Sequence, residues 1–276
     1  MKKLVALLLV LIFCITVITG GRLTYNKKLN NIANSAVDEY KAALIELEQK
    51  EMEAIAMEEA RIETLLHTLT EGLNNQIKEL ILENYHQDGD VKILVFGTNN
   101  VILENEDGKS WPKIAEDRLN EAYEKDMFVF ESKSFGDRTS IQIIEEGLHV
   151  QLAENDADIV LIESSIWNDS IGQVAPADTR TVLSMKMNAI ERENEDAVIL
   201  VHPAPPVYDT QFYPIYVEEL KEFVIEEGYL YIDYWTDWPS IDDEVLLNYV
   251  NDGGSSLTDL GKLSLSENIL DIFMNK

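Results

Sequence analysis

Asparagine side chains follow two apolar runs in the second half of the chain, at positions suited to chemistry. Asn99 follows VKILVF (91–96), and Asn168 follows ADIVLIES (157–164). A carboxamide N–H can stabilise a developing oxyanion or bind a ligand, but Asn also caps turns and helices and braces loops through the local backbone. Both interpretations stay open for both residues. Trp167, beside Asn168, is the aromatic side chain best placed to contact a ligand.

Groups for nucleophilic catalysis or metal binding are sparse. The 4 histidines are widely spaced and Cys14 is the single cysteine, which excludes an intrachain disulfide framework and a Cys-based metal cluster. His202 lies between an apolar run and a group of prolines, which favours a structural or rim role. Asp242 and Asp243 lack further ligands at the alternate spacing of a calcium loop. We expect neither a metal nor a cofactor.

Alternating strands and helices must position these side chains. Apolar runs alternate with amphipathic stretches from Val91 to the end of the chain, which predicts a parallel sheet covered by helices on both faces. The ligand crevice of such folds lies beyond the carboxyl ends of the strands. We therefore expect the site in the loops after Phe96, Ser132, Ser165 and Pro203. The expected strands are 91–96, 127–132, 157–164, 197–203 and 229–235, and the expected helices are 111–123, 139–153, 179–193, 217–227 and 263–274.

Four loop sequences, in this order of elements, resemble the SGNH or GDSL hydrolase superfamily. They are KILVFGTNN, SFGDRTS, ADIVLIESSIWNDS and NDGGSSLTDLG, and the resemblance covers the chain from Val91 onward. It implies a flavodoxin-like, three-layer α/β domain with a five-stranded parallel sheet. It also implies a relative of esterases, lipases and carbohydrate deacetylases, in a membrane-anchored bacterial branch.

The positions that match the superfamily's catalytic pair carry other residues. The Gly-Asp-Ser block aligns with Gly97-Thr98-Asn99, which places the carboxamide of Asn99 where the nucleophilic serine stands. The Asp-x-x-His block places Ser255 or Ser256, depending on the register, at the general base. No histidine follows His202. The hydroxyl–imidazole pair on which this acyl transfer depends is therefore lost.

Part of the superfamily's oxyanion pocket is retained. The resemblance implies a pocket formed by Thr98, Asn99, Gly136, Trp167 and Asn168. We expect an inactive relative, a pseudoenzyme that binds a ligand or acts as an accessory protein at the cell envelope. The alternative is a divergent esterase or carbohydrate O-deacetylase that has rebuilt its site from other residues. A purely structural stalk protein is a third possibility.

The first residues predict that the protein is located at a membrane. Two lysines precede an uncharged run from Leu4 to Gly21, which matches a signal anchor and is at the lower limit for a membrane-spanning helix. We expect residues 1–21 to form a single-pass anchor with the main domain outside the cytoplasm. Cleavage and secretion is the second choice.

A long helical pattern follows the anchor. From Leu29 to Tyr85 there is no proline and the single glycine is Gly72, while apolar residues recur in steps of three and four. We expect residues 22–88 to form an acidic helical stalk and residues 89–276 the SGNH-like domain. The stalk could pair two chains as a coiled coil. The alternative is one or two helices folded against the domain, with a break near Gly72.

The charge balance limits the partners. With 51 acidic against 22 basic side chains the net charge is −29, which argues against nucleic acid and against docking on anionic headgroups through a basic surface. The expected partners are the membrane through the N-terminal helix, an envelope glycan or acyl ligand, and a second copy of the chain.

Overall fold

The computed structural model describes residues 2–251, 253 and 256–275, and the chain divides into two units, Met1–Thr64 and Leu65–Lys276. No structural measurement bears on the expected boundaries at residues 21 and 88, which stay predictions.

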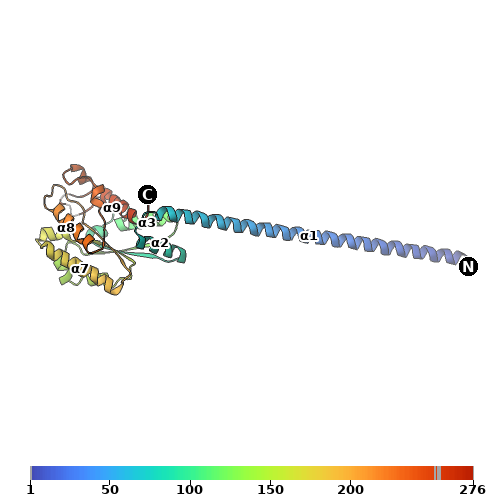
Figure 1. Cartoon of the computed structure of the whole chain (residues 1–276). Helices are drawn as coiled ribbons and strands as arrows, with labels where there is room; N and C mark the ends of the chain where they lie inside the picture. The colour runs from blue at the N-terminus through green and yellow to red at the C-terminus, as the bar shows by residue number, and fades with distance from the viewer. Residues whose placement is uncertain (1, 252, 254–255, 276) are drawn as a thin grey trace. The chain divides into compact units, whose positions relative to one another are not determined.

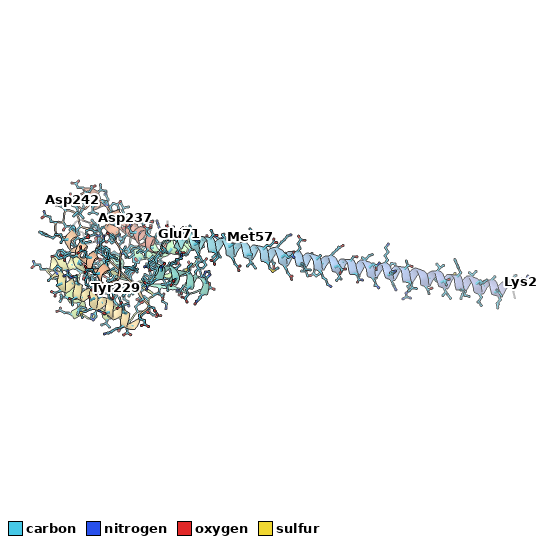
Figure 2. The ribbon with its side chains drawn as sticks, in the orientation of Figure 1. Lys2, Met57, Glu71, Tyr229, Asp237 and Asp242 are labelled. Atoms are coloured by element: carbon cyan, nitrogen blue, oxygen red, sulfur yellow. The ribbon has the colours of Figure 1, made fainter. Side chains whose placement is uncertain are left out.

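Unit 1 is formed by one helix, α1 (Lys2–Thr70), which continues into the start of unit 2. Its N-terminal part contains an 18-residue window of mean hydropathy 2.8, long and apolar enough to cross a membrane. Among residues 2–64 no side chain is buried, and Figure 2 shows side chains projecting along the whole helix. The pair Lys50–Glu46, at 2.7 Å, has the i,i+4 spacing that supports an exposed helix.

The helical pattern that runs to Tyr85 is interrupted at Gly72. α1 ends at Thr70, Gly72 has a φ of +80°, and α2 (Asn75–Gln87) begins after Asn74. Asn74 caps α2, because its Oδ1 accepts from the backbone N–H of Gln76 at 2.9 Å. The break expected near Gly72 is therefore present, while the stalk and the pairing of two chains through it stay predictions.

The sheet of unit 2 has five strands, all parallel, in the order β2-β1-β3-β4-β5. This confirms the expected α/β architecture. The strands are β1 (Val91–Gly97), β2 (Phe128–Ser134), β3 (Ile159–Glu163), β4 (Val198–His202) and β5 (Leu230–Tyr231). Every residue of β3 and β4 is buried, as expected for central strands covered on both faces.

Helices cover both faces of this sheet (Figure 1). On one side, α7 and α8 pack on an apolar cluster that includes Phe96, Ile162 and Val201. On the other side α3 lies against α9, and the hydroxyl of Tyr123 donates to the carbonyl of Phe273 at 2.6 Å. The helices that follow α2 are α3 (Trp111–Ala122), α4 (Ser140–Glu145), α5 (Val150–Ala153), α6 (Ile166–Gly172), α7 (Pro176–Glu193), α8 (Tyr213–Glu226) and α9 (Asp259–Phe273). The short 3₁₀ turns are η1 (Asn99–Val101), η2 (Tyr234–Asp237) and η3 (Glu244–Asn248).

Two expected elements differ in the structure. The fifth strand covers only Leu230–Tyr231 rather than 229–235, because it is an edge strand paired with β4 alone and η2 follows soon after it. The helix expected over 139–153 is split into α4 and α5 near Gly147, which has a φ of +70°. A short helix that the sequence analysis did not predict, α6, follows β3.

Candidate functional site

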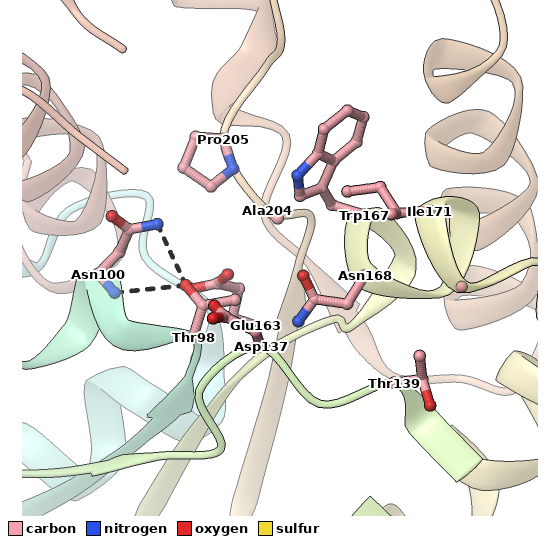
Figure 3. A pocket seen from close by; sticks show the side chains of 11 residues that line it. Thr98, Asn100, Asp137, Thr139, Glu163, Trp167, Asn168, Ile171, Ala204 and Pro205 are labelled. Carbon is pink, nitrogen blue, oxygen red and sulfur yellow. Dashed lines mark hydrogen bonds between the residues drawn. The ribbon is translucent and has the colours of Figure 1, made fainter. Parts of the chain in front are cut away.

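A cavity of about 280 Å³ lies at the carboxyl ends of the central strands, where the sequence places the site. Figure 3 shows its side chains converging from the ends of β1 and β3, from α6, and from the loops after β2 and β4. It is lined by Thr98, Asn100, Asp137, Thr139, Glu163, Trp167, Asn168, Ile171, Gly172, Ala204 and Pro205.

The loop after β1 forms one wall of the cavity. Thr98 caps η1: its Oγ1 accepts from the backbone N–H of Asn100 at 3.4 Å and from Asn100 Nδ2 at 3.1 Å (Figure 3). Gly97 must be a glycine here, because a Cβ would lie 2.5 Å from Val101 Cγ1 and 2.7 Å from Glu163 Oε2. The close turn thus brings the end of β1 directly against Glu163.

Glu163 is the last residue of β3 and the most perturbed carboxyl of the cavity. It is 1 % exposed, and burial raises its pKa to about 7, while hydrogen bonds from Thr98 and the charge of Lys186 act in the opposite direction. Its Oε2 lies near the end of β1, whereas Oε1 is buried with no hydrogen-bond partner among the described residues. A buried acceptor without a partner is costly and marks a place where a donor fits.

Asn99, at the position of the superfamily's nucleophile, belongs to a chain of hydrogen bonds. Asn99, which aligns with the superfamily's serine, accepts at Oδ1 from Ser134 Oγ at 3.0 Å. Ser134 Oγ in turn accepts from the backbone N–H of Gly136 at 2.9 Å. Gly136 has a φ of +64°, which favours glycine. The backbone N–H that would stabilise an oxyanion is therefore engaged by a side chain of the same protein.

Asn168 and Trp167 come from α6. Asn168 Nδ2 donates to the carbonyls of Arg138 (3.1 Å) and Gly136 (3.4 Å), so it braces the loop after β2, one of the two roles left open by the sequence. The amide nitrogen is therefore engaged by backbone acceptors of the same protein. The half-buried indole of Trp167 lines the cavity and packs edge-on against Tyr213 with ring centroids 5.0 Å apart.

The loop expected to carry the general base lies against the loop after β1. The backbone N–H of Leu257 donates to Asn100 Oδ1 at 2.9 Å, which joins the two loops. Next to it, Ser256 interacts with Asn251: the backbone N–H of Asn251 donates to its carbonyl at 2.9 Å. Ser255 lies outside the described residues.

His202 is a buried structural histidine. It is 0 % exposed at the end of β4, its Nδ1 donates to the carbonyl of Pro203 at 2.9 Å, and burial lowers its pKa to about 4. Trp111 and Tyr234 pack edge-on against its ring. The imidazole is therefore neutral at physiological pH, and it is not among the residues that line the cavity.

A buried cation lies behind the cavity. Lys186 of α7 is 1 % exposed, with its Nζ 5.6 Å and 5.4 Å from the ring centroids of Phe96 and Phe135. Burial lowers its pKa to about 8, against the attraction of Asp169 and Glu163. Asp169, also buried, accepts from the hydroxyl of Thr179 at 2.8 Å.

The structure brings together Thr98, Trp167 and Asn168 in one cavity, with Gly136 and Asn99 joined through Ser134 beside it. Sequence reasoning missed Glu163, and a signal was present, because an acidic residue ends the apolar run Ile159 to Ile162. Lys186 gave a similar signal on the apolar face of its helix. Among the described residues, no three metal-ligating side chains come together.

Comparisons with solved structures define the class of fold. Unit 2 resembles a GDSL-like lipase from Parabacteroides merdae (TM-score 0.55, 10 % identity, 67 % of this chain and 96 % of that one). It also resembles a carbohydrate esterase family 3 protein from Talaromyces cellulolyticus (0.52, 12 %, 66 % and 95 %) and the psychrotrophic esterase EstA from a Pseudoalteromonas species (0.51, 17 %, 66 % and 96 %). No family model and no curated protein matches the chain.

The domain therefore has an SGNH/GDSL-hydrolase-like fold, as the sequence predicts. At 10 to 17 % sequence identity these similarities show a shared fold and do not show a shared reaction.

Proposed function

We propose that the chain is an extracytoplasmic binding or accessory protein of the cell envelope, which holds a glycan or acyl ligand in the cavity without cleaving it. The observation that carries the proposal is the hydrogen-bond chain from Gly136 N–H through Ser134 to Asn99. Acyl transfer needs a nucleophile and free donors aimed at the oxyanion. Here a carboxamide stands at the nucleophile position and the donors of Gly136 and Asn168 are engaged internally.

One observation favours a second candidate, a rebuilt esterase. Thr98 and Glu163 line the same cavity and interact, and the raised pKa of Glu163, about 7, suits a general base. In that candidate the Thr98 hydroxyl attacks an ester carbonyl and Glu163 takes its proton. The internal engagement of the donors of Gly136 and Asn168 argues against it, so we rank it second.

An esterase assay separates the two candidates. We expect the full chain, purified in a polyoxyethylene detergent, to hydrolyse p-nitrophenyl acetate no faster than buffer, and Asn99→Ser to stay inactive because no base partners it. Turnover that is lost in Thr98→Val and in Glu163→Gln, but retained in the exposed control Glu195→Gln, would instead establish the rebuilt esterase.

Binding is tested with the same preparation. Saturation-transfer NMR with soluble peptidoglycan fragments and with short-chain acylglycerols should show contact for the wild type and loss of contact in Trp167→Ala. Folded protein that contacts neither class of compound would leave the binding role unsupported.

The membrane location is part of the proposal. Lys2 and Lys3 precede the apolar part of α1, and positive charge before a span favours the cytoplasmic side for that end. We infer a single pass with unit 2 outside the cytoplasm, and cleavage with secretion as the alternative. External protease should degrade unit 2 in intact spheroplasts, whereas protection would place it inside.

A further inference from the structure

The hydrogen-bond donors of the cavity are largely used within the protein. Asn168 Nδ2 donates to the carbonyls of Gly136 and Arg138. Asn100 Nδ2 donates to Thr98, and Thr98 interacts with the carboxyl of Glu163. A ligand that presents an anion or a carbonyl oxygen thus meets few donors.

The acceptors of the cavity, in contrast, include one without a partner among the described residues. Oε1 of Glu163 is buried without a hydrogen-bond partner among the described residues, although the residue lines the cavity. Asp137 adds a second carboxylate from the loop after β2, and the carbonyl oxygen of Asn168 remains once its nitrogen is engaged. A ligand that donates several hydrogen bonds satisfies these groups.

Basic side chains lie outside the lining of the cavity, although the buried Lys186 attracts Glu163 through the protein. Of the 11 residues that line it, two are acidic and none is Lys, Arg or His. Arg138, in the adjoining loop, pairs with Glu146 at 2.9 Å. Lys186 is buried under the rings of Phe96 and Phe135 and does not line the cavity.

An aromatic face completes the site. The indole of Trp167 lines the same cavity, and Figure 3 shows it on the side where Pro205 and Ala204 lie. A cation over an indole face gains about 0.5 to 2 kcal/mol, the larger value where water is excluded. Carboxylates beside an indole are the chemistry that recognises an organic ammonium group.

We propose that this cavity binds its ligand through a primary ammonium group, which donates to Glu163 Oε1 and to Asp137 and lies against Trp167. The inference rests on the proposed binding function and adds the chemical class of the ligand. A hydroxyl donor would give Oε1 a partner, but it would bring no positive charge to a cavity whose lining contains two carboxylates and no basic side chain. The ammonium supplies both the donor and the charge.

Three matched sugars test the ammonium group directly. Glucosamine, glucose and N-acetylglucosamine share a ring and differ in the group at one carbon, which is charged in the first alone. Calorimetric titration of the full chain, in a polyoxyethylene detergent and 300 mM salt to screen the surface charge, should show glucosamine binding at least tenfold more tightly than the other two. Glu163→Gln and Asp137→Asn should each remove that advantage, and Glu195→Gln, an exposed acid of the same type, should keep it.

The outcomes separate this inference from the function on which it rests. Equal binding of all three sugars, lost in Trp167→Ala, would overturn the ammonium group and leave the binding function standing. Glucosamine binding that is unchanged in Glu163→Gln would place the amine elsewhere on the acidic surface and overturn the proposal. Absence of glucosamine binding in folded protein overturns it as well, whatever the NMR screen of envelope compounds shows.

Discussion

Glu163 links the stability of the domain to its site. Its carboxyl has a pKa of about 7 in the folded chain against 4.5 for the ordinary value, because burial disfavours the charged form. A raised carboxyl pKa means that the folded state holds the proton more tightly than the unfolded state. Its contribution to stability is therefore fully present below about pH 4.5 and is lost as the pH rises through 7.

Replacing Glu163 by glutamine should remove this dependence. We expect Glu163→Gln to become more stable relative to the wild type as the pH rises from 5 to 8, by up to about 3 kcal/mol for a shift of this size. Thermal unfolding of the two proteins at several pH values measures the difference. His202, whose pKa is lowered, has the opposite pH dependence but is present in both proteins, so it cancels.

Glu195→Gln serves as the control, because this acid is exposed on the loop before β4. It should show a flat difference across the same pH range. A flat difference for Glu163→Gln as well would mean that the Glu163 carboxyl is solvated, and the ammonium site would lose its buried acceptor.

At the scale of elements, caps decide where helices begin. Thr258 Oγ1 accepts from the backbone N–H of Gly261 at 3.1 Å and donates to the carbonyl of Asn248 at 2.6 Å, which fixes the start of α9. α9 in turn covers α3 and one face of the sheet.

Thr258→Ala should destabilise unit 2 by about 1 to 2 kcal/mol through loss of this cap. The matched control is Thr181→Ala in the exposed middle of α7, where Thr Oγ1 bonds back to Ala177 and alanine is the better helix former, so the change should be neutral or slightly stabilising. Chemical denaturation of the three proteins measures both effects. Equal losses at the two positions would show that the cap contributes nothing specific.

The sequence predicts the order of elements but not their ends. Strands such as 157–164 are recognised because they contain an uninterrupted apolar run, here Ile159 to Ile162, whereas β5 looks equally apolar and stops after Tyr231, since its length depends on a single neighbouring strand. The site is predictable where a loop motif survives, as at Asn168. Glu163 was missed because its role depends on Gly97 in the adjacent strand, and this contact between β1 and β3 cannot be seen in either segment alone.

At the scale of the whole molecule, α1 presents apolar side chains to solvent at helical spacing. Ile32, Tyr40, Leu44 and Leu47 are each 40 to 66 % exposed. Steps of three, four and eight place them toward one side of the helix, and the proposed membrane anchor would confine two chains to a plane, where they meet readily. Burial of this face between two copies would remove apolar area from water at about 25 cal/mol per Å². We propose a homodimer through this face.

Single cysteines test the dimer in the full chain. In a Cys14→Ser background, Leu44→Cys should form an interchain disulfide in isolated membranes under mild oxidation, because the apolar face meets its counterpart. Gln49→Cys is the matched control, since it lies about 140° around the helix from Leu44 and about 180° from Tyr40, and so points away from that face. Cross-linking at both positions alike would indicate random collision, and none at Leu44 would show that the chains do not pair along α1. A disulfide confined to Leu44 would mean that each assembly carries two copies of the cavity, so that a ligand repeated along an envelope polymer could be held at two points at once.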